Sequence, residues 1–387
     1  MVKSLILIGL VFLFTFGCKK SNEKEQTVEE SEDITAALPL EIPFPKDNPI
    51  TKEKAELGKL LFFDPILSGN KDVACATCHH PEFGFAENLE LSIGVNGHGF
   101  GSKRAFKQPN NIPFVKRNSQ SIVNVAFNGL LQDGSLSPEK APMFWDLRAE
   151  SLEKQALEPI KTMEEMRGKD ISEEIILDRI MERLRENKVY VGLFERAFGS
   201  QNSVSVENLG KALATYQRTI VANNSRFDKY LRGDQAALSF NEIEGMKGFG
   251  KSGCTACHNG PMFSDFQLHV LGVADNEKLG FLDTGKDNKY AFRTPSLRNL
   301  RLTAPYMHSG KLKTLKHVIE FYEDLAGNVI ANPQIKTSQI DPKIDKLKVD
   351  FKDISAIIEF LGTLNDESYD KTIPKKVPSG LKVGGNI

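Results

Sequence analysis

The stretch Cys75–His79 reads C-A-T-C-H, and a second stretch, Cys254–His258, reads C-T-A-C-H. In a C-x-x-C-H motif the two thiols can add to the vinyl groups of a haem, and the adjacent histidine is then placed to bind the iron from its proximal face. Two copies of the motif therefore predict two covalently bound c-type haems. The residues expected to attach the haems, with both histidines as proximal iron ligands, are Cys75, Cys78, His79, Cys254, Cys257 and His258.

Paired C-x-x-C motifs also occur in zinc sites and in redox disulfides. The two pairs are 179 residues apart (254 minus 75), whereas a ribbon-type zinc site spaces its pairs by roughly 15 to 20 residues. A thioredoxin-like site needs a strand before the motif, but residues 51–63 and 241–249, which precede the two motifs, have helical patterns. Neither alternative explains a histidine directly after each second cysteine, so the sequence favours haem.

The N-terminus has the features of an export signal. Residues 1–18 combine a basic Lys3 with an apolar run from Leu5 to Phe16 that is too short to span a membrane. The run ends in T-F-G-C, which resembles a bacterial lipoprotein cleavage box, although Phe16 is bulky for such a box. We therefore expect a lipoprotein-type signal peptide and a protein anchored by a lipid at Cys18 on the periplasmic side of a bacterial membrane. A plain signal peptide, giving a soluble periplasmic protein, is the alternative.

The rest of the chain is long enough for two cores. Residues 19–37 are polar and acidic without an aromatic residue, which is typical of a flexible tether. The roughly 350 residues that follow the tether suffice for two domains at the usual 100 to 200 residues per domain. A formal net charge of -1 gives no reason to expect a nucleic-acid partner.

An internal repeat organises these two domains. A helical pattern with a glycine precedes each C-x-x-C-H motif, and a proline-containing loop with aromatic residues follows it. Residues 352–364 have apolar side chains at helical spacing, and residues 171–198 and 204–231 also predict helices, with Gly199 and Gly233 as their ends. Helix, haem motif, loops and closing helix resemble a cytochrome c domain, present twice.

We therefore predict a mainly α protein with two cytochrome c-like domains side by side and a haem in each. The N-terminal domain is expected over residues 38–236 and the C-terminal domain over residues 237–370, followed by a tail over residues 371–387. A short β-hairpin is expected around residues 267–273. The region from residue 94 to 142 is rich in glycine, asparagine and proline and predicts long loops.

Beyond the haem motifs, the chain resembles the bacterial dihaem cytochrome c peroxidases, together with the related dihaem enzyme that matures methylamine dehydrogenase. The similarity extends from about residue 40 to about residue 365, far beyond the two motifs. The segments that carry it are, in chain order, Leu57–Gly58, Leu61–Asp64, Ser92–Gly94, Arg117–Ser119, Phe144–Asp146, Gln155–Met166, Thr294–Asn299 and Thr303–Gly310.

The resemblance implies that the two haems have different roles. In the family the first motif carries the haem that reacts with peroxide, and the second carries the haem through which electrons enter. Cleavage of hydrogen peroxide needs a group that takes a proton from one oxygen and returns it to the other. The resemblance assigns this role to Glu165, with Gln155 as its pocket neighbour. The alternative is that Glu165 is an ordinary solvated helix carboxylate, the commoner fate of a glutamate.

Two further assignments rest on the resemblance. Trp145, the one tryptophan of the chain, corresponds to the family residue between the two haems, where it would assist electron transfer; packing in a core is the alternative. The family also binds a calcium ion near this place through an asparagine side chain and main-chain carbonyls. Asn118, Thr303 and Pro305 occupy those positions, and such oxygen ligands suit Ca²⁺.

The sixth ligand of the first haem differs from that of the ordinary peroxidase, which places a releasable histidine after Ser-Ile-Gly. Here Val95 has that position. His98 follows three residues later, inside an insertion over about residues 96–116, and either replaces the ligand or is a loop histidine. We favour the loop, which would leave the peroxide-reacting haem open without a reductive switch.

The sixth ligand of the second haem is a methionine in the ordinary peroxidase, 14 residues after the histidine of a Tyr-x-His-x-Gly segment. Counted from His308, this position is Tyr322, and the methylamine-related enzyme has a tyrosine ligand there. A phenolate stabilises ferric iron. The alternatives are that Tyr322 is a packed aromatic residue, that His317 or Met307 is the ligand, or that the protein supplies none. No metal role is expected for the other histidines His80, His269 and His308, although the resemblance suggests that His308 tunes the interface.

Three functions are compatible with these sequence features. We expect reduction of hydrogen peroxide to water with electrons from a small cytochrome c or cupredoxin. The first alternative is oxidation of a partner protein or organic molecule through high-valent iron, which Val95 and Tyr322 favour. The second is a non-enzymatic dihaem electron carrier. The peroxidases of this family are usually dimers, so the resemblance also implies a homodimer.

Overall fold

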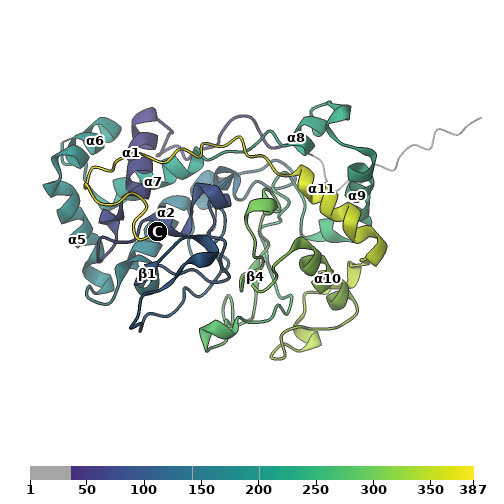
Figure 1. The fold of residues 1–387 in the computed structure, drawn as a ribbon. Helices are drawn as coiled ribbons and strands as arrows, with labels where there is room; N and C mark the ends of the chain where they lie inside the picture. Colours follow the sequence, from purple (N-terminus) through teal and green to yellow (C-terminus); the bar gives the residue numbers. More distant parts are fainter. Residues whose placement is uncertain (1–35, 142, 200) are drawn as a thin grey trace, which may run out of the picture. The chain divides into compact units, whose positions relative to one another are not determined.

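The chain folds mainly into helices, as the sequence predicts (Figure 1). About 41% of it is helical and 5% is strand in the computed structural model, which describes residues 36–141, 143–199 and 201–387. The signal peptide, Cys18 and nearly all of the expected tether lie outside the described residues. Within the described part, no helix has both the length and the hydrophobicity needed to cross a membrane.

The helices and strands are short and are joined by long loops. The helices are α1 (Lys52–Phe63), α2 (Cys75–Cys78), α3 (Leu152–Gln155), α4 (Glu158–Lys161), α5 (Glu173–Glu186), α6 (Lys188–Phe198), α7 (Val206–Arg218), α8 (Arg226–Leu231), α9 (Phe240–Lys251), α10 (Leu315–Ala326) and α11 (Ile354–Thr363). Two pairs of two-residue strands are antiparallel: β1 (Gly97–His98) with β2 (Ala105–Phe106), and β3 (Leu268–His269) with β4 (Phe292–Arg293).

The first haem motif lies in a core built by α1, α5, α6 and α7. The sequence predicted one helix over residues 171–198, but the structure has two, because the side chain of Asn187 accepts hydrogen bonds from the backbone N–H groups of Val189 and Tyr190 and so begins α6. The helix predicted over residues 204–231 is likewise divided into α7 and α8. Gly199 and Gly233 have positive φ just past α6 and α8, as expected for helix ends.

The second haem motif lies beside a smaller core in which α9 packs against α11. The closing helix predicted over residues 352–364 is confirmed as α11. Four phenylalanines form the centre of this core, with ring centroids 5.4 to 6.2 Å apart: Phe227, Phe249, Phe263 and Phe360. Three of these ring pairs are edge to face and two are tilted, and edge-to-face packing at such distances stabilises a core beyond the area that it buries.

The main helix pair of each core depends on one glycine. A Cβ atom on Gly58 of α1 would lie 2.0 Å from the carbonyl oxygen of Ala212 in α7, and one on Gly245 of α9 would lie 1.9 Å from the carbonyl oxygen of Ala356 in α11. Both contacts are with backbone, which cannot turn aside as a side chain can. The glycine ahead of each haem motif therefore allows two helix backbones to approach closely.

We expect Gly245→Ala to lower the free energy of unfolding by about 1–3 kcal/mol, the usual cost of overpacking a core. The matched control is Gly362→Ala on α11, because a Cβ atom at that exposed position meets nothing within 4 Å. The control is expected to raise the free energy of unfolding by up to about 1 kcal/mol through helix propensity. Denaturant unfolding of the two variants checks the opposite signs, and an equal effect at both positions would contradict the close approach at Gly245.

The prediction of a local β-hairpin around residues 267–273 is wrong, because the strand in this segment pairs with a distant segment. Leu268 and His269 do form a strand, but it pairs with Phe292 and Arg293 across a loop of more than 20 residues. A local pattern identifies an extended segment but does not show which distant segment will supply its hydrogen bonds. The loops predicted over residues 94–142 are confirmed as far as residue 141, with β1, β2 and a few 3₁₀ turns inside them, and residue 142 lies outside the described residues.

The C-terminal segment returns to the first haem motif (Figure 1). Tyr369 and Val377 are buried in the core of the first half, and the Thr77 hydroxyl donates to the Gly384 carbonyl oxygen at 2.8 Å. The Ser379 hydroxyl donates to the Asp64 carboxylate at 2.6 Å. The segment expected as a tail thus packs beside the CxxCH residues, whereas the proposed boundary at residues 236 and 237 stays a prediction.

Candidate functional site

One cavity of about 610 Å³ joins the two C-x-x-C-H motifs. Its lining is contributed by both halves of the chain and includes all six predicted haem residues: Cys75, Cys78, His79, Cys254, Cys257 and His258. The four cysteines are free thiols and form no disulfide with one another. The cavity therefore presents the thiols and imidazoles that two covalent haems require.

The two histidines are oriented in the same way. The Nδ1–H of His79 donates to the carbonyl oxygen of Phe85, and that of His258 donates to the carbonyl oxygen of Phe263, each over 2.9 Å. A carbonyl can only accept, so Nδ1 carries the proton and Nε2 is left as the ligating nitrogen. Burial lowers the pKa of both histidines and thereby favours the neutral ring. The site fits two iron-bound histidines.

Both carbonyls are presented by an unusual backbone conformation. Phe85 and Phe263 are completely buried and have φ values of 55° and 52°. Such left-handed conformations are costly for a bulky residue and persist only where the surrounding core enforces them. The sequence contains the matching signal, a phenylalanine six residues after His79 and five after His258, but its meaning appears only in the structure.

Glu165 lies on a single π-helical turn, Met163–Arg167, and lines the cavity together with Gln155. Burial raises the pKa of Glu165 to about 7, an effect that the Arg148 guanidinium opposes. The charge of Glu165 acts on the thiols of both Cys75 and Cys78, so the carboxyl group is near the first motif. Its surroundings differ from those of a solvated helix carboxylate, and its catalytic role stays a prediction.

The Ser-Ile-Gly segment supports this turn and does not point a ligand at the first motif. A Cβ atom on Gly94 would lie 2.1 Å from the carbonyl oxygen of Glu165, and the Val95 N–H donates to the carbonyl of Glu164 at 3.1 Å. Val95 is buried in the core. His98 is exposed on β1 and does not belong to the cavity lining. Among the described residues, these positions favour the interpretation of His98 as a loop histidine.

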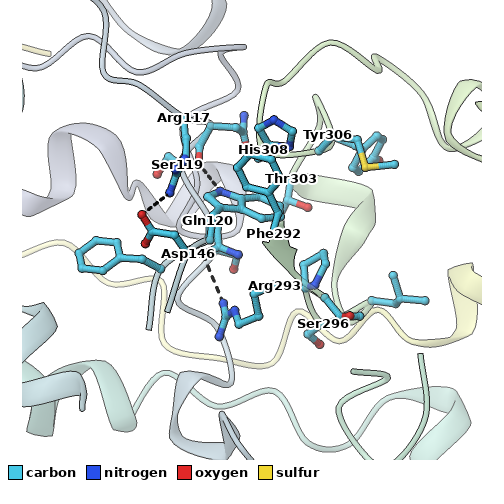
Figure 2. A pocket seen from close by; sticks show the side chains of 18 of the residues that line it. Arg117, Ser119, Gln120, Asp146, Phe292, Arg293, Ser296, Thr303, Tyr306 and His308 are labelled. Carbon is cyan, nitrogen blue, oxygen red and sulfur yellow. Dashed lines mark hydrogen bonds and ion pairs between the residues drawn. The ribbon is translucent and has the colours of Figure 1, made fainter. Parts of the chain in front are cut away.

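The side chains between the two motifs form an aromatic cluster. The Trp145 indole N–H donates to the carbonyl of Asn118 at 3.0 Å, and its ring meets that of His308 edge to face at 6.3 Å. Figure 2 shows His308 and Phe292 together, and their rings are stacked with centroids 3.5 Å apart. Burial lowers the pKa of His308 to about 3, so this ring is neutral. Trp145 is thus buried where the two halves meet, which suits either of its two interpretations.

An ion-pair network crosses the same boundary beside the aromatic cluster, and Figure 2 shows its contact between Arg117 and Asp146. Arg117 donates to Asp283 through Nε at 2.6 Å and Nη2 at 2.9 Å, and its Nη1 lies 2.7 Å from Asp146. Although burial opposes it, hydrogen bonding from Arg117 lowers the pKa of Asp283 to about 2. Arg117 belongs to a matching family segment, but its partner Asp283 lies 166 residues away and sequence reasoning did not find it.

Of the three residues considered as sixth ligand of the second haem, two line the cavity and one does not. Leu315, Val318, Ile319 and Tyr322 present one face of α10 to the cavity. Burial raises the pKa of the Tyr322 phenol, and the thiols of Cys254 and Cys257 raise it further, so this hydroxyl lies close to the second motif. Met307 also lines the cavity, whereas His317 is exposed and lies outside the lining.

The three predicted calcium ligands line the same cavity. Asn118 uses its Nδ2 to donate to the carbonyls of Leu89 and Glu90, at 2.8 and 3.3 Å, which leaves its side-chain oxygen as an acceptor. Thr303 and Pro305 lie on the facing wall of the second half. The donor set is of the type that calcium accepts, and calcium binding by these residues stays a prediction.

Comparison with known proteins gives one consistent family. Residues 52–236 match the family model of the di-haem cytochrome c peroxidases. The chain is 34% identical to the methylamine utilization protein MauG of Methylorubrum extorquens over 360 residues, covering 90% of each chain. It is 32% identical to the cytochrome c551 peroxidase of Pseudomonas aeruginosa, covering 81% of this chain and 83% of that protein.

Solved structures agree with this result. The fold matches a MauG-like protein associated with microbial copper homeostasis with a TM-score of 0.66 and 29% identity, covering 86% of this chain and 95% of that chain. It also matches the diheme peroxidase BthA of Burkholderia thailandensis with a TM-score of 0.64, covering 87% and 91% of the two chains. At 22% identity the second likeness concerns the fold alone.

Proposed function

Because this chain belongs to the di-haem cytochrome c peroxidase family, we propose that it reduces hydrogen peroxide to water with electrons from a small cytochrome c or cupredoxin. The observation that carries this proposal is the half-buried carboxyl group of Glu165 in the cavity wall, near both cysteines of the first motif and with its pKa raised to about 7 by desolvation. A group that both takes and returns a proton works best with a pKa near the operating pH.

The reaction consumes one hydrogen peroxide, two electrons and two protons and yields two water molecules. Glu165 takes the proton from one peroxide oxygen and delivers it to the other as the O–O bond breaks. Gln155, from the end of α3, orients the peroxide by hydrogen bonding. When bound, the two haems would supply the peroxide-binding iron and the path for electrons, held by the two C-x-x-C-H motifs. Trp145 assists electron transfer between them.

The remaining parts of the proposal concern location and accessory groups. The enzyme acts on the periplasmic side of a bacterial membrane, either anchored by a lipid at Cys18 or soluble in the periplasm, as the leader residues suggest. A calcium ion at Asn118, Thr303 and Pro305 would brace the boundary beside Trp145, since the Asn118 carbonyl accepts the Trp145 N–H. A homodimer is expected from the family resemblance.

A second candidate function is oxidation of a partner protein or organic molecule. Two observations favour it: the chain is 34% identical to a protein named for methylamine utilization, and Tyr322 lines the cavity near the second motif. An anionic oxygen ligand would stabilise the oxidised state of the second haem. If the partner is a protein, it should carry a side chain that this oxidation has modified.

The proposed function is tested with the protein carrying both haems, by electron paramagnetic resonance and peroxide consumption before and after addition of one electron per molecule. We expect a high-spin ferric signal before any reduction, and peroxide consumption as soon as a reduced donor is supplied, both unchanged in His98→Ala, because His98 is exposed and outside the cavity lining. Two low-spin haems, one becoming high-spin only after reduction, would show instead that a reductive switch is present. If peroxide is not consumed in either state with a reduced donor, the peroxidase proposal is wrong.

A further inference from the structure

The internal repeat extends to a carboxyl group that the proposed reaction does not use. Two residues after the phenylalanine that orients each proximal histidine stands an acidic residue, Glu87 in the first half and Asp265 in the second. Each is close to the second cysteine of its motif, Cys78 or Cys257. The charges that accompany the two carboxyl groups, however, are arranged differently.

In the first half the carboxyl group itself faces the cysteine. Glu87 is 3% exposed and lies against the Cys78 thiol, where its charge is the largest influence on that thiol after burial. Arg104, with a completely buried side chain, stands behind it with Nε 3.4 Å from the Glu87 carboxylate. The same guanidinium donates to the carbonyls of Ile93 and Gly99 and to the side chain of Asn386. Arg104 is thus fixed by the backbone, and the negative group is nearest the sulfur.

In the second half a cation faces the cysteine. Nδ1 of His269 lies 2.6 Å from Asp341, and Nε2 lies 3.0 Å from Asp265. A carboxylate only accepts, so both ring nitrogens carry protons and the imidazole is positively charged. His269 is 6% exposed and contacts the Cys257 thiol. A carboxylate oxygen of Asp265 also lies within 4.8 Å of the Cys257 sulfur, but Asp265 accepts from Lys343 Nζ at 2.8 Å as well, so Lys343 balances the charge of this carboxylate.

We propose that these two groups set the reduction potentials of the two haems in opposite directions, Glu87 lowering that of the first haem and His269 raising that of the second. A buried charge next to the cysteine that bonds the macrocycle acts through protein and not through water, so it is weakly screened. A negative charge favours ferric over ferrous iron because the ferric form carries one more positive charge, and a positive charge does the reverse. The inference rests on the two covalent haems of the proposed function and not on peroxide as the substrate.

The test is a spectroelectrochemical titration of the protein carrying both haems, with the two midpoint potentials followed separately. At about pH 9, above the pKa of about 7 to which burial raises Glu87, we expect Glu87→Gln to raise the potential of the first haem. We expect His269→Gln to lower the potential of the second. Each change should alter the ratio of reduced to oxidised haem at a fixed potential by about tenfold, equivalent to about 59 mV for one electron.

Each variant has an internal control, because the haem of the other half should keep its potential. Glu82→Gln removes an exposed carboxylate from the same loop as Glu87 and should change neither potential, while Glu87→Asp retains the charge and should restore most of the wild-type value. If His269→Gln does not retain its haem, Lys343→Met removes a partly exposed cation from the same group and should lower the second potential by less. Shifts of the same sign in both halves, or no shift in haem-loaded variants, would overturn the proposal. Because turnover is not the readout, that result would leave the peroxidase proposal standing.

Discussion

Replacing Glu165 with glutamine is expected to lower kcat/KM for hydrogen peroxide by about 10²–10⁴-fold, the usual contribution of a positioned acid–base group. Glutamine has nearly the same shape and fills the same place on the turn Met163–Arg167, so both haems should remain attached. The loss would therefore come from proton transfer and not from the fold. Steady-state peroxide consumption with a reduced donor, alongside haem content by absorbance, measures the effect.

The pH dependence separates this role from a structural one. Cleavage begins with the ionised carboxylate, so kcat/KM should rise with pH and level off above the pKa of about 7 to which burial raises Glu165. In Glu165→Gln this rise of kcat/KM with pH should disappear. The control is Glu158→Gln on α4, a half-exposed carboxylate paired with Lys161 at 2.6 Å. It should retain the rate and the rise of kcat/KM with pH, with the rise moved to slightly lower pH because the charge of Glu158 helps to raise the pKa of Glu165. A normal profile in Glu165→Gln would remove this residue from the mechanism.

The features that the sequence indicates most directly are those whose meaning is local. In each C-x-x-C-H motif, five consecutive residues contain both the attachment chemistry and the iron ligand, and the structure places the cysteines and histidines of both motifs in the lining of one cavity. Amphipathic spacing similarly predicted α1, α9 and α11. The break between α5 and α6 was missed because Asn187 caps a helix with its side chain inside a continuous apolar pattern.

What sequence reasoning missed depends on partners that are distant in the chain. The ion pair of Arg117 with Asp283 spans 166 residues, and that of His269 with Asp341 spans 72. A histidine between two carboxylates has a very different charge from a lone one: although burial disfavours the imidazolium, hydrogen bonds to Asp265 and Asp341 raise the pKa of His269 to about 10. Only folding brings these groups together, and His269 therefore had no expected role.

The second large effect is expected from Tyr322→Phe, which removes one oxygen atom and keeps the aromatic ring. If that oxygen binds the second iron, its loss takes away an anionic donor and raises the potential of the second haem by an amount on the order of 100 mV, within the range that axial ligands control. The ring would still fill its place among the α10 side chains that line the cavity, so stability should change little. Spectroelectrochemical titration, with electron paramagnetic resonance to follow the spin state of each haem, measures the result.

Two further variants decide between the interpretations of Tyr322. Tyr306→Phe removes the hydroxyl of another tyrosine that lines the cavity, one already engaged by donating to the carbonyl of Leu300 at 2.9 Å, and it should leave the potential unchanged. Met307→Leu tests the other cavity residue that the sequence offered as the sixth ligand. An unchanged potential in Tyr322→Phe together with a shift in Met307→Leu would make Met307 the ligand and Tyr322 a packing residue. The oxidation of a partner molecule would then lose the structural feature that most favours it, because a thioether stabilises ferrous iron where a phenolate stabilises ferric iron.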